Sequence, residues 1–177
     1  INPDFVSDPK KLEEFPLSQL LVYGYAKSNS TANELLHSKK ALTDKVAVIG
    51  RACDVRAMVE LEKKIQLRWD NLFIISFHDL GYLPNKTLRS FFKKADVDLD
   101  KVVHERLTQS QYILTLENGK QKTFDLDKKL NISDNCSRCV DKSHPLADFL
   151  LSTYTLPLDS QDYIITPQSD RATDLIS

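Results

Sequence analysis

Two short, continuously apolar runs separated by an amphipathic segment constrain the fold of this chain most. The runs are residues 46–49 and 72–75, and residues 54–66 between them carry apolar side chains at helical spacing. A strand that is apolar at every position is typical of a parallel sheet, whose neighbouring strands are joined by a crossover helix. The sequence therefore predicts a βαβ unit with parallel strands.

Cysteine and histidine residues follow the two predicted strands. Cys53 comes after the first strand and Gly50, just before a helix that we expect to begin at Asp54, with Asp54 as its cap. The second strand runs into His78 and Asp79. Ligand sites of open parallel sheets lie at the carboxyl ends of strands, and a helix N-terminus favours a thiolate. We therefore expect these side chains at one edge of the sheet.

The weaker patterns complete an α/β fold, which we expect to be a small mixed sheet with flanking helices and a β-hairpin insertion. Residues 1–44 are predicted to be an N-terminal helical segment, continuous with the core or part of a larger N-terminal region. Residues 45–177 are predicted to form the α/β domain. The other predicted elements are helices over residues 7–15, 31–42, 85–95 and 169–176, a strand over 20–23, hairpin strands over 112–116 and 122–126, and an extended segment over 163–165.

The remaining two of the three cysteines, Cys136 and Cys139, form a Cys-x-x-Cys pair in a polar stretch. Such a loop bends so that both sulfurs can face one point, as a soft metal requires. Our interpretation is that Cys53 meets this pair in space and that the three thiolates hold an iron–sulfur cluster. The candidates for a fourth ligand are Asp79, His78 and His144.

Three other interpretations of these cysteines remain open. A zinc site with three thiolates and a histidine is chemically reasonable, although zinc ligands usually come as two compact pairs. A redox-active thiol–disulfide pair is another, although that motif usually follows a strand and opens a helix. The third is a surface pair without a ligand, with Cys53 as a small core residue. Arg51 is expected either to stabilise a negatively charged cluster or flavin, or to form an ordinary salt bridge.

Composition excludes some classes of function. A formal net charge of −1 gives no electrostatic case for nucleic-acid binding, and no apolar run approaches the roughly 20 residues of a membrane span. The first residues contain neither a signal-peptide pattern nor an initiator Met, so we expect a fragment or a processed subunit. Three cysteines without a secretory segment indicate reduced thiols and a cytoplasmic location.

Three features follow one another in a fixed order: the strand, glycine and cysteine turn of residues 45–57, the hairpin of residues 112–126, and the loop of residues 134–141 with Ala147-Asp148 behind it. In this order they resemble the beta subunits of deazaflavin-coenzyme-reducing hydrogenases and dehydrogenases. That family consists of iron–sulfur flavoproteins and includes formate dehydrogenase beta subunits. The resemblance runs from about residue 45 to the C-terminus.

The resemblance implies ligands and cofactors. Cys53, Cys136 and Cys139 match family cluster cysteines, and Asp79 stands where the family has another. A 4Fe-4S cluster held by these four residues is thus expected in residues 45–177, with Arg51 near the cofactor and FAD as a second candidate cofactor. Two departures are that Ala52 replaces a usual proline, and that no glycine-rich flavin-binding segment occurs near the start.

The function implied is that of an oxidoreductase subunit. It would pass electrons between a flavin and a partner redox subunit in an enzyme linked to a deazaflavin coenzyme or to formate, and no residue is assigned a catalytic role. The alternative is a non-catalytic assembly or structural domain of the same fold, with zinc or without a cofactor.

Overall fold

The computed structural model describes residues 6–13, 30–78 and 80–177, which form two compact units. The parallel-sheet unit comprises residues 27–79, 140–156 and 163–177. The antiparallel-sheet unit comprises residues 1–26, 80–139 and 157–162. The chain thus leaves the parallel-sheet unit twice, for residues 80–139 and again for residues 157–162.

The parallel-sheet unit is built on four strands in the order β1-β2-β6-β7. The strands are β1 (Val46–Gly50), β2 (Leu72–Phe77), β6 (Phe149–Ser152) and β7 (Ile164–Pro167). The first three are parallel and β7 runs antiparallel to β6. Because Gly50 pairs with Ser76, β1 and β2 end at the same edge of the sheet.

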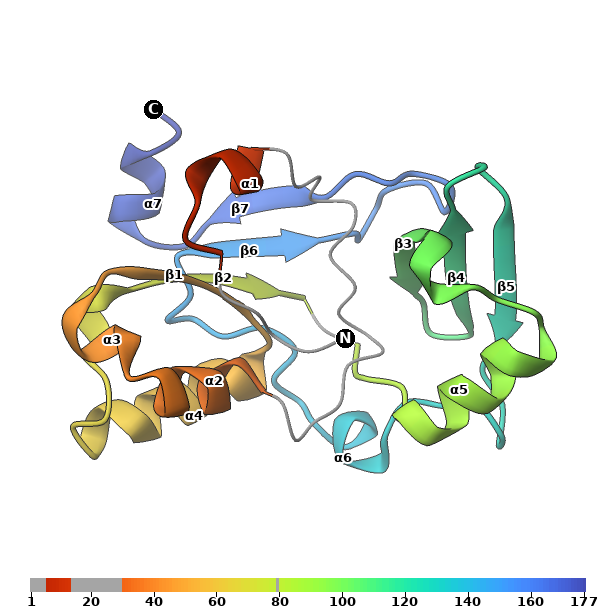
Figure 1. Cartoon of the computed structure of the whole chain (residues 1–177), viewed down its shortest axis with the longest axis horizontal. Helices are drawn as coiled ribbons and strands as arrows, with labels where there is room; N and C mark the ends of the chain where they lie inside the picture. Colours follow the sequence, from red (N-terminus) through yellow and green to blue (C-terminus); the bar gives the residue numbers. More distant parts are fainter. Residues whose placement is uncertain (1–5, 14–29, 79) are drawn as a thin grey trace. The chain divides into compact units, whose positions relative to one another are not determined.

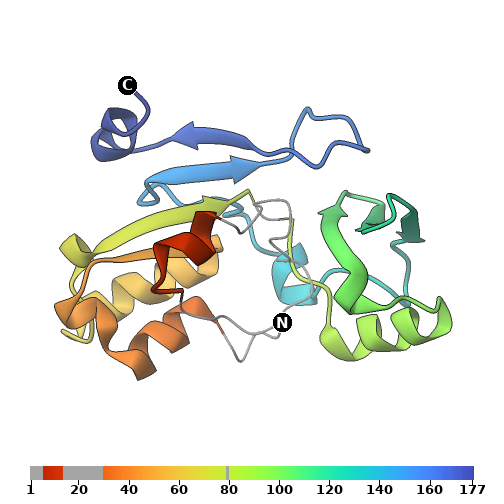
Figure 2. The same cartoon turned by 45° about the horizontal axis from the view of Figure 1, so that its top comes forward.

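Helices cover one face of this sheet (Figures 1 and 2). The crossover from β1 to β2 is α4 (Ala52–Lys63), followed by a 3-10 turn over Trp69–Asn71, with α2 (Thr31–Ser38) and α3 (Lys40–Thr43) beside it. Val55 and Met58 of α4 are fully buried. The amphipathic segment expected over residues 54–66 is helical only as far as Lys63, and Ile65, which takes a positive φ of 57° beyond the helix end, is 83% exposed. A short helix, α7 (Asp170–Asp174), follows β7.

The antiparallel-sheet unit contains three strands in the order β3-β4-β5. Its elements are α1 (Pro9–Glu13), α5 (Asn85–Lys94), a 3-10 turn over Leu99–Lys101, β3 (Val102–Leu107), β4 (Gln111–Leu116), β5 (Gln121–Asp125) and α6 (Asp134–Ser137). Leu88 and Phe92 of α5 pack with Tyr112 of β4 in a core of this unit's own. Gly119, in the β4–β5 turn, takes the positive φ (75°) that this turn requires.

The predicted fold class is confirmed: the sheet is mixed, helices flank it, and β4 and β5 form the expected hairpin. The hairpin belongs to a separate three-stranded sheet, however, and its partner β3 was not predicted. This strand contains the polar segment His104-Glu105-Arg106. These side chains are nevertheless buried, because Tyr112 donates a 2.5 Å hydrogen bond to Glu105 and Arg106 donates one to the carbonyl of Pro157.

Several helix limits differ from prediction. The helix expected over residues 31–42 is interrupted at Lys39, whose φ is 55°. The predicted strand over residues 20–23 lies outside the described residues, and the predicted domain boundary at residues 44 and 45 stays a prediction. Within the part of the chain that is described, no helix has the length and apolar character needed to cross a membrane.

Candidate metal centre

Cys53 is the second residue of α4, and its thiol is exposed. The prediction that Asp54 caps this helix was wrong. The N-cap is Arg51, and the buried Asp54 carboxylate accepts a 3.0 Å hydrogen bond from the Arg51 backbone N–H. Cys53 therefore lies within the first helical turn, where amide N–H groups have no intrahelical acceptor, at the edge where β1 and β2 end.

The side chain of Arg51 is only 4% exposed. It carries a buried positive charge at the junction of β1 and α4, two residues before Cys53. Whether this charge serves a bound cofactor or an internal ion pair stays a prediction.

Cys136 and Cys139 lie in and just after α6, a single helical turn, and both are half-buried thiols. The Cys139 N–H donates to the Cys136 carbonyl at 3.2 Å, which closes a tight turn between the two residues. Residues three apart in such a turn are neighbours. The Nε of Arg138 donates to the Asp134 carbonyl at 3.2 Å and holds this side chain over the turn.

The backbone of Gly81 approaches the side chain of Cys136. A Cβ atom built on Gly81 would lie 2.8 Å from the Cys136 Cβ, a distance that real Cβ contacts do not reach, and Gly81 has a φ of +138°. The segment that contains Gly81 is held next to the cysteine loop, residues 134–139, by a 3.0 Å hydrogen bond from the Ser133 N–H to the Tyr82 carbonyl. No sequence pattern marked Gly81, because a glycine gives no sign of which distant residue packs against it.

Positive charge gathers beside the cysteine loop, in an open, mostly polar cavity of about 470 Å³. Its lining includes three cations, Lys128, Lys129 and Arg138, and one carboxylate, Asp134. The net positive charge of this lining favours negatively charged groups in and around the loop.

His144, a candidate fourth ligand, is half-buried in the parallel-sheet unit. Burial and the nearby Arg56 charge lower the pKa of His144 below its usual value, and Asp141 opposes this effect. Arg56 in turn donates a 2.9 Å hydrogen bond to Asp141 in an exposed ion pair. A lowered pKa keeps His144 neutral at pH 7, the form that can bind a metal.

Asp79 lies outside the described residues. His78 directly precedes it, and its ring lies edge-on to that of Tyr154 at 4.7 Å between centroids. Within the described part of either unit, no three His, Cys, Asp or Glu side chains gather as a metal-binding group. Because Cys53 belongs to one unit and the cysteine pair to the other, the convergence of the three sulfurs stays a prediction.

Residues 43–176 match the family described as the C terminus of the coenzyme F420 hydrogenase/dehydrogenase beta subunit. Among curated relatives, the beta subunit of F420-dependent formate dehydrogenase 1 from Methanococcus maripaludis is 34% identical over 116 residues, or 62% of this chain and 30% of the relative. The corresponding subunit from Methanocaldococcus jannaschii is 30% identical over 109 residues, or 56% of this chain and 28% of the relative. The matches thus span less than a third of each relative.

A solved structure shares the fold. In a xenon-derivatised F420-reducing NiFe hydrogenase complex from Methanosarcina barkeri, one chain aligns with a TM-score of 0.66 at 20% identity, covering 87% of this chain and 54% of that one. At this identity the similarity is one of fold. The family match covers well over half of the chain, and the protein described here belongs to the coenzyme F420 hydrogenase/dehydrogenase beta subunit family, within the C-terminal part of that subunit.

Proposed function

We propose that this chain is the iron–sulfur electron-transfer part of a deazaflavin- or formate-linked dehydrogenase or hydrogenase beta subunit. Cys53, Cys136, Cys139 and Asp79 would hold a 4Fe-4S cluster. Such a cluster supplies one-electron transfer, here between a flavin and a partner redox subunit. FAD and a deazaflavin coenzyme are the further cofactors of this proposal, and the reducing cytoplasm is its compartment.

The exposed thiol of Cys53 at the carboxyl edge of the parallel sheet is the observation that carries the proposal. In open parallel sheets this edge is where ligands bind. The strand β2 ends at the same edge, and residue 79 follows its last residue by two positions. In sequence, a thiol thus follows β1 by three positions and a carboxylate follows β2 by two.

The second support is that the chain after Cys139 is anchored near Cys53 within the parallel-sheet unit. Asp141 pairs with Arg56, which lies one helical turn after Cys53 on α4. Only Val140 separates Cys139 from Asp141 in sequence, so the Cα atoms of these two residues lie at most about 7 Å apart.

The third support is a contact of Cys136 with a residue close to Asp79 in sequence. Gly81 abuts the Cys136 side chain, and Asp79 lies two residues before Gly81 in sequence. The donor set fits iron, because three soft thiolates favour it and the carboxylate is a harder, weaker fourth ligand.

Anaerobic purification of the full chain, with iron and sulfide analysis, tests the proposal. We expect roughly four irons per chain and absorbance near about 400 nm from thiolate-to-iron charge transfer. Cys53→Ser should remove most of the iron. Ala57→Ser, which adds a hydroxyl to an exposed position of the same helix, should retain it.

Two results would reject the proposal. Full iron content in Cys53→Ser would show that Cys53 is not a ligand. Stoichiometric zinc in the parent protein, without iron or sulfide, would favour the assembly domain with a structural metal.

A further inference from the structure

The contact between Gly81 and Cys136 is tight enough to exclude any side chain at position 81. The Cβ of Cys136 is 2.8 Å from the place where a Gly81 Cβ would stand, and the Cβ of Ile132 is 3.3 Å from it. The φ of +138° is itself a conformation that L-residues rarely adopt. Only glycine allows the backbone to pass this close to the cysteine.

Both sides of the contact are anchored. Leu80, on one side, and Ile132, on the other, pack against the same core of the antiparallel-sheet unit, whose fully buried members include Leu83 and Leu130. The hydrogen bond from the Ser133 N–H to the Tyr82 carbonyl adds a direct link between the two segments. Neither segment can move away from an added methyl group without disturbing this core.

We propose that Gly81 is a positioning residue for Cys136: its backbone forms the wall that sets where the Cys136 thiol lies. The contact lies within one unit and does not depend on a cofactor. The consequence for ligand geometry rests on the proposed function, in which Cys136 binds iron.

The chain offers a matched control in Gly119. This glycine also has a positive φ, +75°, but an added Cβ would have no neighbour within 4 Å. Gly119→Ala should therefore destabilise the fold only because alanine disfavours a positive φ, without any collision. Gly81→Ala should destabilise the fold both through the positive φ and through the collision of its methyl group with Cys136.

The first test is the rate of alkylation of Cys136 by iodoacetamide relative to Cys139, in the full, reduced, metal-free chain, measured by peptide mass spectrometry. We expect Gly81→Ala to push Cys136 outward and raise this ratio at least about threefold, because alkylation follows thiol exposure. Gly119→Ala should leave the ratio at the parent value. An equal ratio in both variants and the parent would overturn the proposal.

A double-mutant cycle keeps the test decisive if Gly81→Ala folds poorly. Cys136→Gly removes the Cβ with which the new methyl group collides. Gly81→Ala lowers the urea concentration at the midpoint of unfolding, and this decrease should then be at most about half as large in the Cys136→Gly background as in the parent. Equal losses in the two backgrounds would show that Cys136 is not the obstruction.

The last readout uses the cofactor. After anaerobic reconstitution, Gly81→Ala should change the electron paramagnetic resonance signal and the reduction potential, whereas Gly119→Ala should keep the parent values. If the parent binds no iron, the proposed function fails while the alkylation ratio still decides the role of Gly81. If the parent binds iron and Gly81→Ala matches it in ratio, signal and potential, only the positioning role fails.

Discussion

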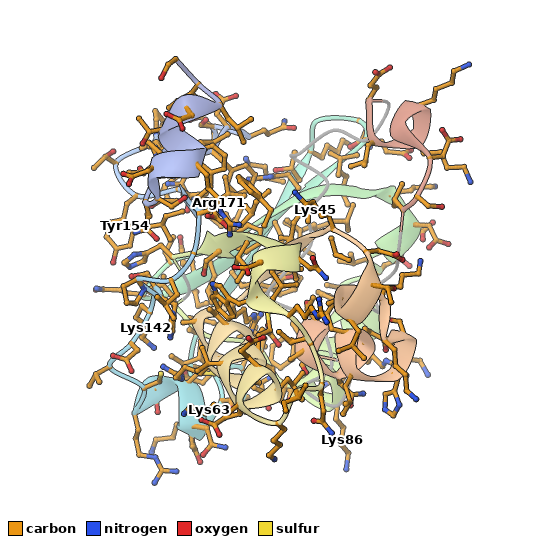
Figure 3. All side chains as sticks on the ribbon, turned by 90° about the vertical axis from the view of Figure 1, so that its left-hand side faces the viewer. Lys45, Lys63, Lys86, Lys142, Tyr154 and Arg171 are labelled. Atoms are coloured by element: carbon orange, nitrogen blue, oxygen red, sulfur yellow. The ribbon has the colours of Figure 1, made fainter. Side chains whose placement is uncertain are left out.

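Arg171 holds the buried carboxylate of Asp148 through two hydrogen bonds, from Nε to Oδ1 at 2.5 Å and from Nη2 to Oδ2 at 2.6 Å. The Ser169 hydroxyl donates to Oδ1 and the Ile74 N–H donates to Oδ2, both at 2.7 Å. The guanidinium also lies 5.3 Å from the centre of the Phe73 ring, and Figure 3 labels this side chain. Asp148 thus joins β2 and α7 next to the start of β6.

Arg171→Met should lower the free energy of unfolding by about 2–4 kcal/mol, because it leaves a buried carboxylate without its main charged donor. Urea unfolding followed by circular dichroism measures this change. Arg56→Met is the matched control: it breaks the exposed pair with Asp141, so its cost should be about 0–1 kcal/mol. Equal losses in the two variants would contradict a structural role for the Asp148–Arg171 pair.

The same pair should make stability depend on pH. Burial raises the pKa of Asp148, but hydrogen bonds from Arg171, Ser169 and the Ile74 amide lower it more, so the pKa lies below its usual value of 3.8. As the pH falls, the Asp148 carboxylate is therefore protonated at a higher pH in the unfolded chain than in the folded protein. The stabilisation is complete above about pH 5 and is lost as the pH falls through 3.8 toward the folded pKa.

Unfolding free energies between about pH 3 and pH 6 measure this effect. The parent should lose stability more steeply below about pH 4 than Asp148→Asn, which has no proton to bind at this position. Parallel pH curves for the two proteins would contradict the assignment.

The βαβ core was predictable because its signals are local. Continuous apolar runs identify β1 and β2, helical spacing identifies α4, and the position of Cys53 after β1 follows from both. The error at Asp54 is also local in origin. An aspartate serves equally well as an N-cap or three residues later, where its carboxylate accepts from the N-cap amide, so its presence alone does not fix where the helix begins.

The features that were missed depend on contacts between distant residues. The strand β3 carries buried charged side chains whose hydrogen-bond partners lie outside the strand. Glu105 accepts from Tyr112 on β4, and Arg106 donates to the carbonyl of Pro157, which is far away in sequence. The contact of Gly81 with Cys136 has the same character. Such partners cannot be read from one segment, and neither can a pair such as Asp148–Arg171.

Arg138→Gln should lower the reduction potential of a reconstituted cluster by an amount on the order of tens of millivolts. The positive charge of Arg138 is held beside the cysteine turn by the Asp134 carbonyl and favours the more negative, reduced cluster. Potentiometric titration measures the shift. Lys120→Gln removes the same charge at the β4–β5 turn, at the other end of this unit from α6 (Figure 1), and should change the potential less. A larger shift in Lys120→Gln would contradict the effect assigned to Arg138.

Asp79→Cys should give a cluster that resists oxygen better and has a lower reduction potential, because a thiolate donates more strongly to iron than a carboxylate does. Asp79→Ala should lower the iron content. The change at position 79 leaves the three cysteines in place, so it tests the fourth ligand separately from the other three. Iron analysis before and after exposure to air, with potentiometric titration, measures both effects.

If both variants keep the iron content and the potential of the parent, Asp79 is not a ligand. His78→Ala and His144→Ala would then test the two histidines, and the neutral imidazole of His144 makes that residue the first to examine.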